Sequence, residues 1–333
     1  MLKEKYALAI DIGGTKLRIG LVSEAWELID LFVTQEHQSF SPQQLVIFMA
    51  KNVKSFINRH STLEIIGIGV GYPGPFNHQD NSTFSYCNLR DPSWERVPLA
   101  EMIANETNFP VYVDNDANLA GLAELHIGAG KNFKNLVYIT ISTGTGGAIF
   151  INRQLYRGFL GSAGEFGHMI VDINGVRCKC GNQGCLMSLL SGLGIEKLIE
   201  REPSCQLLFS DGERSIDCIQ KLIELSVGGN SIAQEIMKPI VDYFSVALLN
   251  IIHLLNPEAI IVGGGLGKAL MQFFLPTVQQ YLRENLPKEV INQTQILEAS
   301  LGDQNGILGG AILVFENLLN NQPYCSSQQI NQV

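Results

Sequence analysis

Apolar runs interrupted by glycine turns mark the start of the chain. Residues 6–10 form a short β-prone run, a polar, glycine-rich segment follows at 11–16, and residues 17–22 are apolar again. This pattern predicts two strands joined by a glycine loop. The same pattern returns at residues 137–151, where a glycine loop at 143–147 separates two further strands. The repetition indicates two related halves, each presenting one glycine loop.

Segments of helical periodicity alternate with short buried strands. Apolar residues recur three and four positions apart near the end of the longest such segment, which is typical of an amphipathic helix. Helices are predicted at residues 42–60, 117–125, 244–255 and 307–319. Further strands are predicted at residues 65–71, 111–113 and 259–262. Strands that alternate with helices in this way indicate an α/β protein.

The composition narrows the class of protein. A length of 333 residues corresponds to roughly two domains, and 46% hydrophobic with 17% charged residues argues against intrinsic disorder. The net charge of −9, without long basic runs, argues against partners such as nucleic acid or anionic membranes. The most apolar stretch, residues 245–255, contains Asn250 and His253 and is too short to cross a bilayer.

The seven cysteines are an odd number, and three of them lie close together. This distribution favours a reduced, cytoplasmic protein, and the first apolar run ends at Asp11 before a signal-peptide core develops. Cys178, Cys180 and Cys185, with His168 shortly before them, make up a Cys3His set, the closed ligand arrangement of structural zinc. Unrelated reduced thiols are the alternative.

The two glycine loops have the composition of anion-binding loops. Without side chains, a tight turn lets backbone N–H groups converge on a phosphate, and a carboxylate such as Asp11 beside it can hold Mg²⁺ directly or through water. An ordinary hairpin turn is the alternative for one loop, but two similar loops favour a phosphate clamp. The candidate phosphate-binding residues are Gly13, Gly14, Thr15, Lys16, Thr143, Gly144, Thr145 and Gly146.

Several motifs follow one another along the chain in a specific order. They are Asp11-Ile12-Gly13-Gly14-Thr15-Lys16, Pro73-Gly74-Pro75, Asn115-Asp116-Ala117-Asn118, Thr143-Gly144-Thr145-Gly146-Gly147, Gly164-Glu165-Phe166-Gly167-His168 and the cysteine cluster. Together they resemble the ROK family of sugar kinases and sugar-responsive repressors. The resemblance runs from residue 7 to about residue 315. It implies an ATP- and Mg²⁺-dependent hexokinase, most similar to glucokinase, with small-molecule sugar and nucleotide ligands.

The resemblance implies a role for each motif. Asp116 corresponds to the family's general base, although an aspartate at the start of a helix is also a common N-cap. Asp114 competes with it locally, but the family's base follows directly after the position of Asn115. Asn115 and Glu165 then correspond to sugar ligands, and His168 would bind zinc through one ring nitrogen and the sugar through the other.

Further ligand residues follow from the same resemblance. Asn88 is a weaker sugar ligand, and Gly263, Gly264 and Gly265 correspond to the loop beside adenosine. One position departs from the family: Met187 stands where a glutamate usually reaches the sugar. A methionine cannot accept a strong hydrogen bond, which puts the preference for glucose in question.

The implied fold is a duplicated, actin-like and ribonuclease-H-like α/β architecture of two domains, with ATP and sugar in the cleft. Residues 1–116 plus 306–322 are expected to form the small domain and residues 117–305 the large one with the zinc loop. Residues 323–333 are expected to be a polar tail. A homodimer is implied by resemblance alone.

Three other functions remain open at this point. An N-acylhexosamine kinase or a kinase for another hexose would use the same machinery. A repressor of the family would carry a helix-turn-helix domain before the first glycine loop, where only ten residues precede Asp11. A catalytically dead sugar-binding protein is conceivable because of Met187, although Asp11, Asn115 and Asp116 are all present.

Overall fold

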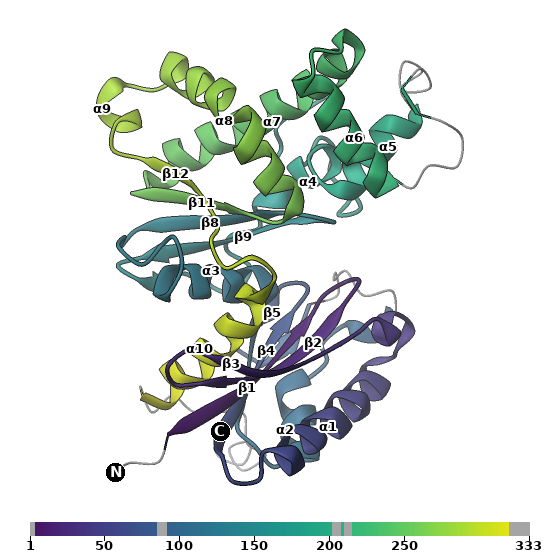
Figure 1. Cartoon of the computed structure of the whole chain (residues 1–333), viewed down its shortest axis with the longest axis vertical. Coiled ribbons are helices and arrows are strands. Elements are labelled where there is room, and N and C mark those ends of the chain that lie inside the picture. The colour runs from purple at the N-terminus through teal and green to yellow at the C-terminus, as the bar shows by residue number, and fades with distance from the viewer. Residues whose placement is uncertain (1–3, 85–91, 202–207, 210–214, 320–333) are drawn as a thin grey trace. The chain divides into compact units, whose positions relative to one another are not determined.

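The computed structural model describes residues 4–84, 92–201, 208–209 and 215–319. Contacts divide the chain into two compact units. The first unit comprises residues 1–127, 155–163 and 303–333, and the second comprises 128–154 and 164–302. Each unit is built around a five-stranded sheet (Figure 1).

The sheet of the first unit has the order β3-β2-β1-β4-β7. Its strands are β1 (Lys5–Ile12), β2 (Leu17–Ser23), β3 (Leu28–Thr34), β4 (Glu64–Tyr72) and β7 (Val111–Asn115). The first three strands are antiparallel neighbours, whereas β4 and β7 run parallel to β1. A small hairpin pairs β5 (Phe76–Asn77) with β6 (Ser82–Thr83).

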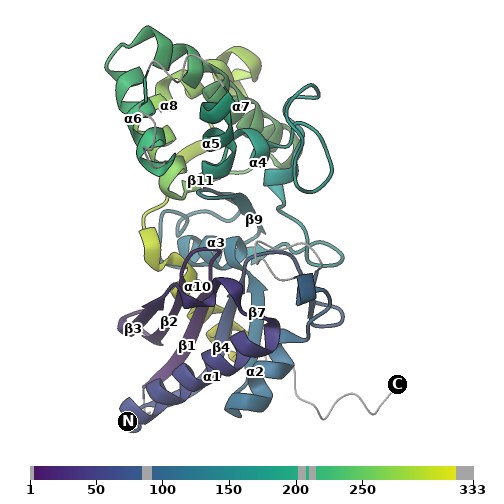
Figure 2. The same ribbon diagram turned by 90° about the vertical axis from the view of Figure 1, so that its right-hand side faces the viewer.

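Helices cover both faces of this sheet (Figures 1 and 2). α1 (Pro42–Arg59) and α2 (Leu99–Thr107) cover the face that carries the large apolar side chains. α10 (Asn305–Leu319) and α3 (Asp116–His126) cover the other face.

Glycines allow α10 to lie directly on the sheet. Gly67, Gly69 and Gly71 alternate along β4 and face α10 and α3, because successive strand residues point to opposite faces. A Cβ on Gly69 would overlap the backbone of Gly310, which is itself a glycine. The glycine-rich side of β4 is therefore a packing surface for a helix.

The sheet of the second unit repeats this plan in the order β10-β9-β8-β11-β12. Its strands are β8 (Leu136–Ile141), β9 (Thr145–Ile151), β10 (Gln154–Leu155), β11 (Ala259–Gly263) and β12 (Gln295–Glu298). As in the first unit, the first strand lies at the centre, with an antiparallel hairpin partner on one side and parallel strands on the other. The predicted duplication of an α/β unit is confirmed.

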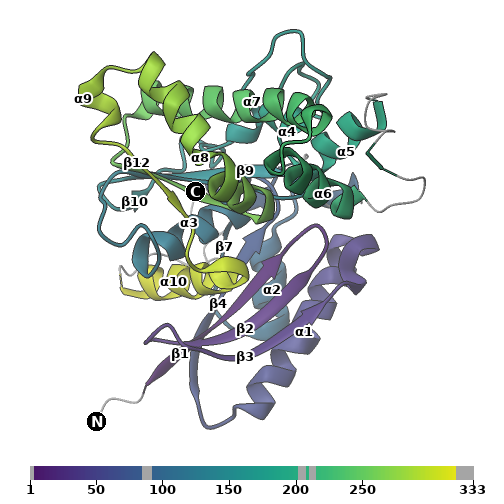
Figure 3. The same cartoon turned by 45° about the horizontal axis from the view of Figure 1, so that its top comes forward.

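Helices make up most of the rest of the second unit (Figure 3). They are α4 (Leu186–Leu189), α5 (Gly192–Arg201), α6 (Ser215–Val227), α7 (Ser231–Leu255), α8 (Gly265–Asn285) and α9 (Lys288–Ile291). By length and composition alone, α7 is the one helix of the described chain that could cross a membrane. Its Phe244, Leu248 and Ile251 are buried in the core of the second unit, as in a core helix.

Some elements differ from the sequence predictions. The second glycine loop is shorter than predicted, because Thr145 to Gly147 pair with β8 and belong to β9. The sequence did not predict β3 or β12. The predicted domain boundary after residue 116 stays a prediction. Contacts group α3 with the first unit, and α3 packs closely on α10, where a Cβ on Gly309 would overlap the backbone of Leu119. The predicted tail, 323–333, lies outside the described residues.

Candidate active site

The carboxyl ends of three parallel strands bring two aspartates to one face of the first sheet. Asp11 of β1 is in register with Gly71 of β4, and Gly71 is in register with Asp114 of β7. Residues in register point to the same face, so the two carboxylates flank a position without a side chain. In α/β proteins ligands bind at this edge of the parallel strands.

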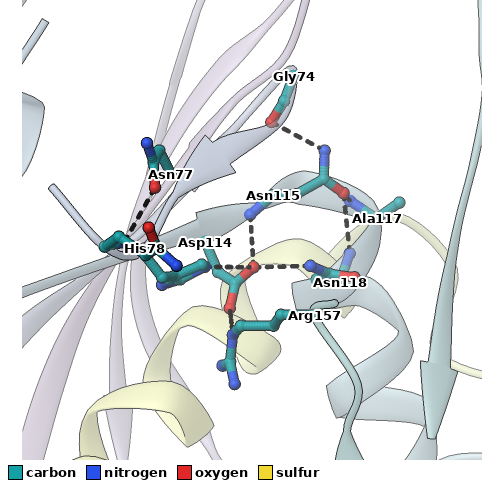
Figure 4. Close-up of polar contacts among 9 residues, drawn as sticks. Gly74, Asn77, His78, Asp114, Asn115, Ala117, Asn118 and Arg157 are labelled. Atoms are coloured by element: carbon teal, nitrogen blue, oxygen red, sulfur yellow. Dashed lines mark hydrogen bonds and ion pairs between the residues drawn. The ribbon is translucent and has the colours of Figure 1, made fainter. Parts of the chain in front are cut away.

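Asn115 closes the turn from β7 into α3. Its Oδ1 accepts hydrogen bonds from the N–H groups of Ala117 and Asn118, at 2.9 and 3.1 Å, and its Nδ2 donates to the carbonyl oxygen of Gly74 at 3.1 Å (Figure 4). Asn115 therefore takes the N-cap position that the sequence left open for Asp116. One hydrogen of the Asn115 amide has no partner in this set and is chemically available to a ligand.

Asp116, the predicted base, is the first residue of α3. Its Cα lies 3.6 Å from the position of a Cβ on Gly71, and Oδ1 of Asp11 lies 3.7 Å from that same position. Asp116 also accepts a hydrogen bond from the N–H group of Ala117 at 2.8 Å. The Cα of Asp116 and the carboxylate of Asp11 thus both lie close to Gly71, on the same face of β4.

Asp114 is fully buried and fully engaged. Its Oδ2 accepts from Nε of Arg157 at 2.7 Å, and its Oδ1 accepts from Nδ2 of Asn118 at 2.7 Å and from the N–H group of Asn115 at 2.8 Å (Figure 4). Burial by itself would raise the pKa of Asp114, but Arg157, His78 and Asn118 outweigh it and hold the pKa well below the ordinary value. A carboxylate with such a low pKa is a poor proton acceptor, so Asp114 is unsuited to be the general base.

Asp11 has one oxygen in an ion pair. Its Oδ2 accepts from Nη1 of Arg18 at 3.0 Å, and Arg18 also contacts Asp303 at 3.4 Å. Burial raises the pKa of Asp11 and outweighs the lowering effect of Arg18. A second cation near Oδ1 would favour the ionised form, so the residue suits Mg²⁺, which usually takes one or two carboxylates together with substrate phosphates.

The first glycine loop is a tight, exposed turn between β1 and β2. The N–H group of Gly13 donates to the carbonyl oxygen of Lys16 at 2.9 Å and closes the turn. Gly14, Thr15 and Lys16 are exposed at its tip. These three residues are the part of the loop that can reach a phosphate.

The second glycine loop offers fewer groups than predicted. Thr143 is exposed and Gly144 half-buried. Thr145 is buried, and its hydroxyl donates to the carbonyl oxygen of Leu190 at 2.6 Å. The side chain of Thr145 is therefore used inside the second unit.

The glycines after β11 divide into two kinds. A Cβ on Gly263 would collide with the ring of Tyr138, and one on Gly264 would overlap the backbone of Ile141. Gly264 also has a φ of +79°, which favours glycine. These two glycines are required by packing, whereas Gly265, the first residue of α8, has open space around it and is the one that a ligand can approach.

The predicted zinc ligands lie together. The ligand atoms of His168, Cys178, Cys180 and Cys185 are all within 4.8 Å of one another. Nδ1 of His168 lies 3.8 Å from Sγ of Cys178, and the Sγ atoms of Cys180 and Cys185 are 3.6 Å apart. A tetrahedron with zinc–sulfur bonds of about 2.3 Å has edges of about 3.8 Å, so these residues fit a structural zinc ion.

Glu165 lies beside this cluster. Its Oε2 is 4.0 Å from Nε2 of His168, the ring nitrogen that faces away from Cys178. Burial raises the pKa of Glu165 to about 7. Cε of Met187 lies 3.0 Å from the position of a Cβ on Gly167, so the methionine packs against the segment that carries both Glu165 and His168.

The sequence analysis did not identify two residues that support Asp114. Arg157 and His78 both lie next to Asp114, yet they are distant from it in the sequence and belong to no motif. A buried aspartate at a strand end requires a cation, which was the available signal. Asn88 lies outside the described residues.

Three known proteins show what the chain is similar to. It is 29% identical to a glucokinase of Halalkalibacterium halodurans, over 94% of this chain and 96% of that protein. It is 28% identical to the xylose repressor of Bacillus spizizenii, over 96% of this chain and 79% of the repressor. A solved ROK family glucokinase from Streptomyces griseus, in complex with glucose and AMPPNP, aligns with a TM-score of 0.75 and 26% identity, over 93% of this chain and 99% of the other.

These similarities confirm the predicted fold class, because the aligned kinase has the same actin-like, ribonuclease-H-like architecture of two α/β domains. Glucokinases and a repressor both align along nearly all of this chain, so overall similarity does not separate enzyme from sensor. The ROK family profile matches residues 7–317, and the chain therefore belongs to the ROK family.

Proposed function

We propose that this protein is an ATP-dependent hexose kinase, with glucose as the first candidate substrate. The observation that carries the proposal is that Asp116, at the start of α3, and the carboxylate of Asp11 both lie beside Gly71. Phosphoryl transfer to an alcohol needs a base for the hydroxyl proton and a cation at the phosphates, and these two carboxylates supply both needs. The similarity to glucokinases supports the same reading.

Each group of the first unit has a chemical task in this proposal. Asp116 accepts the proton of the attacking sugar hydroxyl, and Asn115 orients the sugar through its free amide hydrogen. Asp11 holds Mg²⁺ directly or through water, where the ion would neutralise charge on the phosphates. The exposed N–H groups of Gly14, Thr15 and Lys16 bind the phosphates, and the Lys16 ammonium adds a positive charge.

The second unit contributes sugar ligands on a zinc-ordered segment. Glu165 accepts hydrogen bonds from sugar hydroxyls, and His168 contacts the sugar through Nε2 while Nδ1 belongs to the metal set. Zinc supplies no chemistry in this arrangement, because four protein ligands leave no open position. Its role is to hold a glycine-rich segment that has little core of its own.

A second candidate function is a sugar sensor without kinase activity, which the similarity to the xylose repressor supports. A coupled assay with ATP, Mg²⁺ and a panel of hexoses and N-acylhexosamines separates the two. A kinase phosphorylates at least one sugar, and Asp116→Asn abolishes that turnover. Sugar binding by calorimetry with no phosphorylation of any sugar would instead identify a sensor and overturn the proposal.

A further inference from the structure

His37 is a buried histidine directly behind the first glycine loop. It lies in the short 3-10 helix η1 (Glu36–Ser39), between β3 and α1, and is 1% exposed. Its Nε2 is 2.7 Å from the carbonyl oxygen of Gly13. No motif includes it, and the site described above does not use it.

The chemistry of this contact fixes the state of the ring. A carbonyl oxygen can only accept, so Nε2 of His37 carries a hydrogen and donates it. Nδ1 is buried and has no hydrogen-bond partner among the described residues. A buried nitrogen without a partner costs stability, so His37 lowers the stability of the fold at this position.

The neighbouring residue makes the same kind of contact. Gln38 donates from Nε2 to the carbonyl oxygen of Thr15 at 3.2 Å. Two carbonyl groups of the loop, those of Gly13 and Thr15, are thus drawn toward η1. A phosphate is repelled by carbonyl oxygens and attracted by N–H groups, so turning these carbonyls away prepares the loop for an anion.

We infer that His37, assisted by Gln38, is a positioning residue for the nucleotide phosphates. It holds the carbonyl of Gly13 so that the N–H groups at the tip of the loop face the ligand. The inference rests on the proposed kinase function for its ligand, because Gly13 belongs to the loop assigned to the phosphates of ATP.

The test compares variants by the KM for ATP and the KM for the sugar. His37→Leu fills the same buried space without the donor, so the KM for ATP is expected to rise about three- to tenfold, the size of one hydrogen bond. The KM for the sugar should stay within about twofold. The melting temperature should change little, because removal of the unpaired Nδ1 offsets the loss of the donor to the Gly13 carbonyl. His37→Gln keeps an N–H donor and should recover most of the ATP affinity.

Two further variants keep the test decisive. Gln38→Ala, at a half-buried position, should raise the KM for ATP in the same direction even if His37→Leu fails to fold. His60→Leu is the matched control. His60 lies at the end of α1, where it pairs with Asp30 of β3, away from the first glycine loop. An unchanged KM for ATP in His37→Leu and Gln38→Ala, or an equal rise in both KM values with a lower melting temperature, overturns the inference.

Calorimetry with AMPPNP separates this inference from the proposed function. If the wild-type protein binds AMPPNP but phosphorylates no sugar, the kinase proposal fails. Weaker AMPPNP binding by His37→Leu would still support the role of His37 in that case. A wild-type protein that does not bind AMPPNP overturns both.

Discussion

Nε of Arg157 donates to Oδ2 of Asp114 at 2.7 Å, and the aspartate is completely buried. Arg157 lies in the segment 155–163, which belongs to the first unit although both neighbouring segments belong to the second. The ion pair therefore ties this returning segment to the end of β7, next to Asn115 and Asp116. The ion pair thus fixes the segment 155–163 and also the strand end that leads into Asp116, the candidate base.

Removing the cation should be costly. Arg157→Met leaves a buried carboxylate without its main partner, and the loss of one member of a buried pair destabilises by about 3–5 kcal/mol. Because Arg157 is 32% exposed, we expect the lower end of that range. Urea unfolding measures the effect, and Arg157→Met combined with Asp114→Asn should recover part of the loss. Equal destabilisation in the single and double variants would contradict the pairing.

The low pKa of Asp114 also predicts a pH dependence of stability. A group whose pKa is lower in the folded state stabilises the protein above its unfolded pKa, about 4 for an aspartate, and this contribution is lost as pH falls. Wild-type stability should therefore fall more steeply below about pH 4 than that of Asp114→Asn. Asp242→Asn, at an exposed ion pair, is the control and should keep the wild-type slope. If the melting temperatures of all three proteins fall equally with pH below about pH 4, the pKa of Asp114 is not lowered by folding.

Asp116→Asn should abolish phosphoryl transfer while sugar binding and the fold remain. A general base contributes about 10²–10⁴-fold to a rate, and the amide keeps the shape of the side chain but cannot accept the proton. Steady-state kinetics at saturating sugar, together with calorimetry for sugar binding, measure the two effects. Turnover near the wild-type rate would show that another group is the base.

The Cys3His cluster should hold one zinc ion per chain. Cys180→Ser should lose the metal, loosen the surrounding loop and thereby weaken sugar binding. Cys218→Ser, at a buried cysteine outside the cluster, should keep it. Metal analysis of protein purified without added zinc gives the stoichiometry. A value near zero, with activity indifferent to chelators, would exclude a zinc site.

Met187 should set the preference among sugars. Its side chain packs on Gly167, which lies in the sequence between the candidate sugar ligands Glu165 and His168. Met187→Glu restores a carboxylate acceptor, which a sugar hydroxyl can use for a hydrogen bond worth about tenfold or more in the KM for glucose. Met187→Leu is the control and should leave that KM unchanged. If Met187→Glu has no effect, the side chain does not face the sugar.

Sequence patterns predicted the repeated elements well, because each glycine hairpin and each amphipathic helix is a local feature. α7 was predicted only from residue 244, since the helix begins at a cap, Asn230, that the periodicity did not include. β3 and β12 escaped prediction because both are edge strands without a clear alternation of apolar and polar residues. β3 is apolar on its exposed side as well as on its half-buried side, and β12 has only two apolar residues. The zinc set was predictable from spacing. The contacts of Arg157 and His78 with Asp114, and of His37 with Gly13, were not predictable, because only the tertiary fold brings these residues together.

The glycine-lined contact between β4 and α10 has a consequence for synthesis of the protein on the ribosome. The helix that covers Gly67 and Gly69 comes from the far end of the chain, after the whole second unit has been made. At about 5–20 residues per second, the sheet of the first unit waits roughly 10–40 s for this helix. During that interval the part of the sheet around Gly67 and Gly69 lacks the helix that covers it, while α3 is already made and can cover Gly71. The first unit is therefore completed last, although most of its chain is made first.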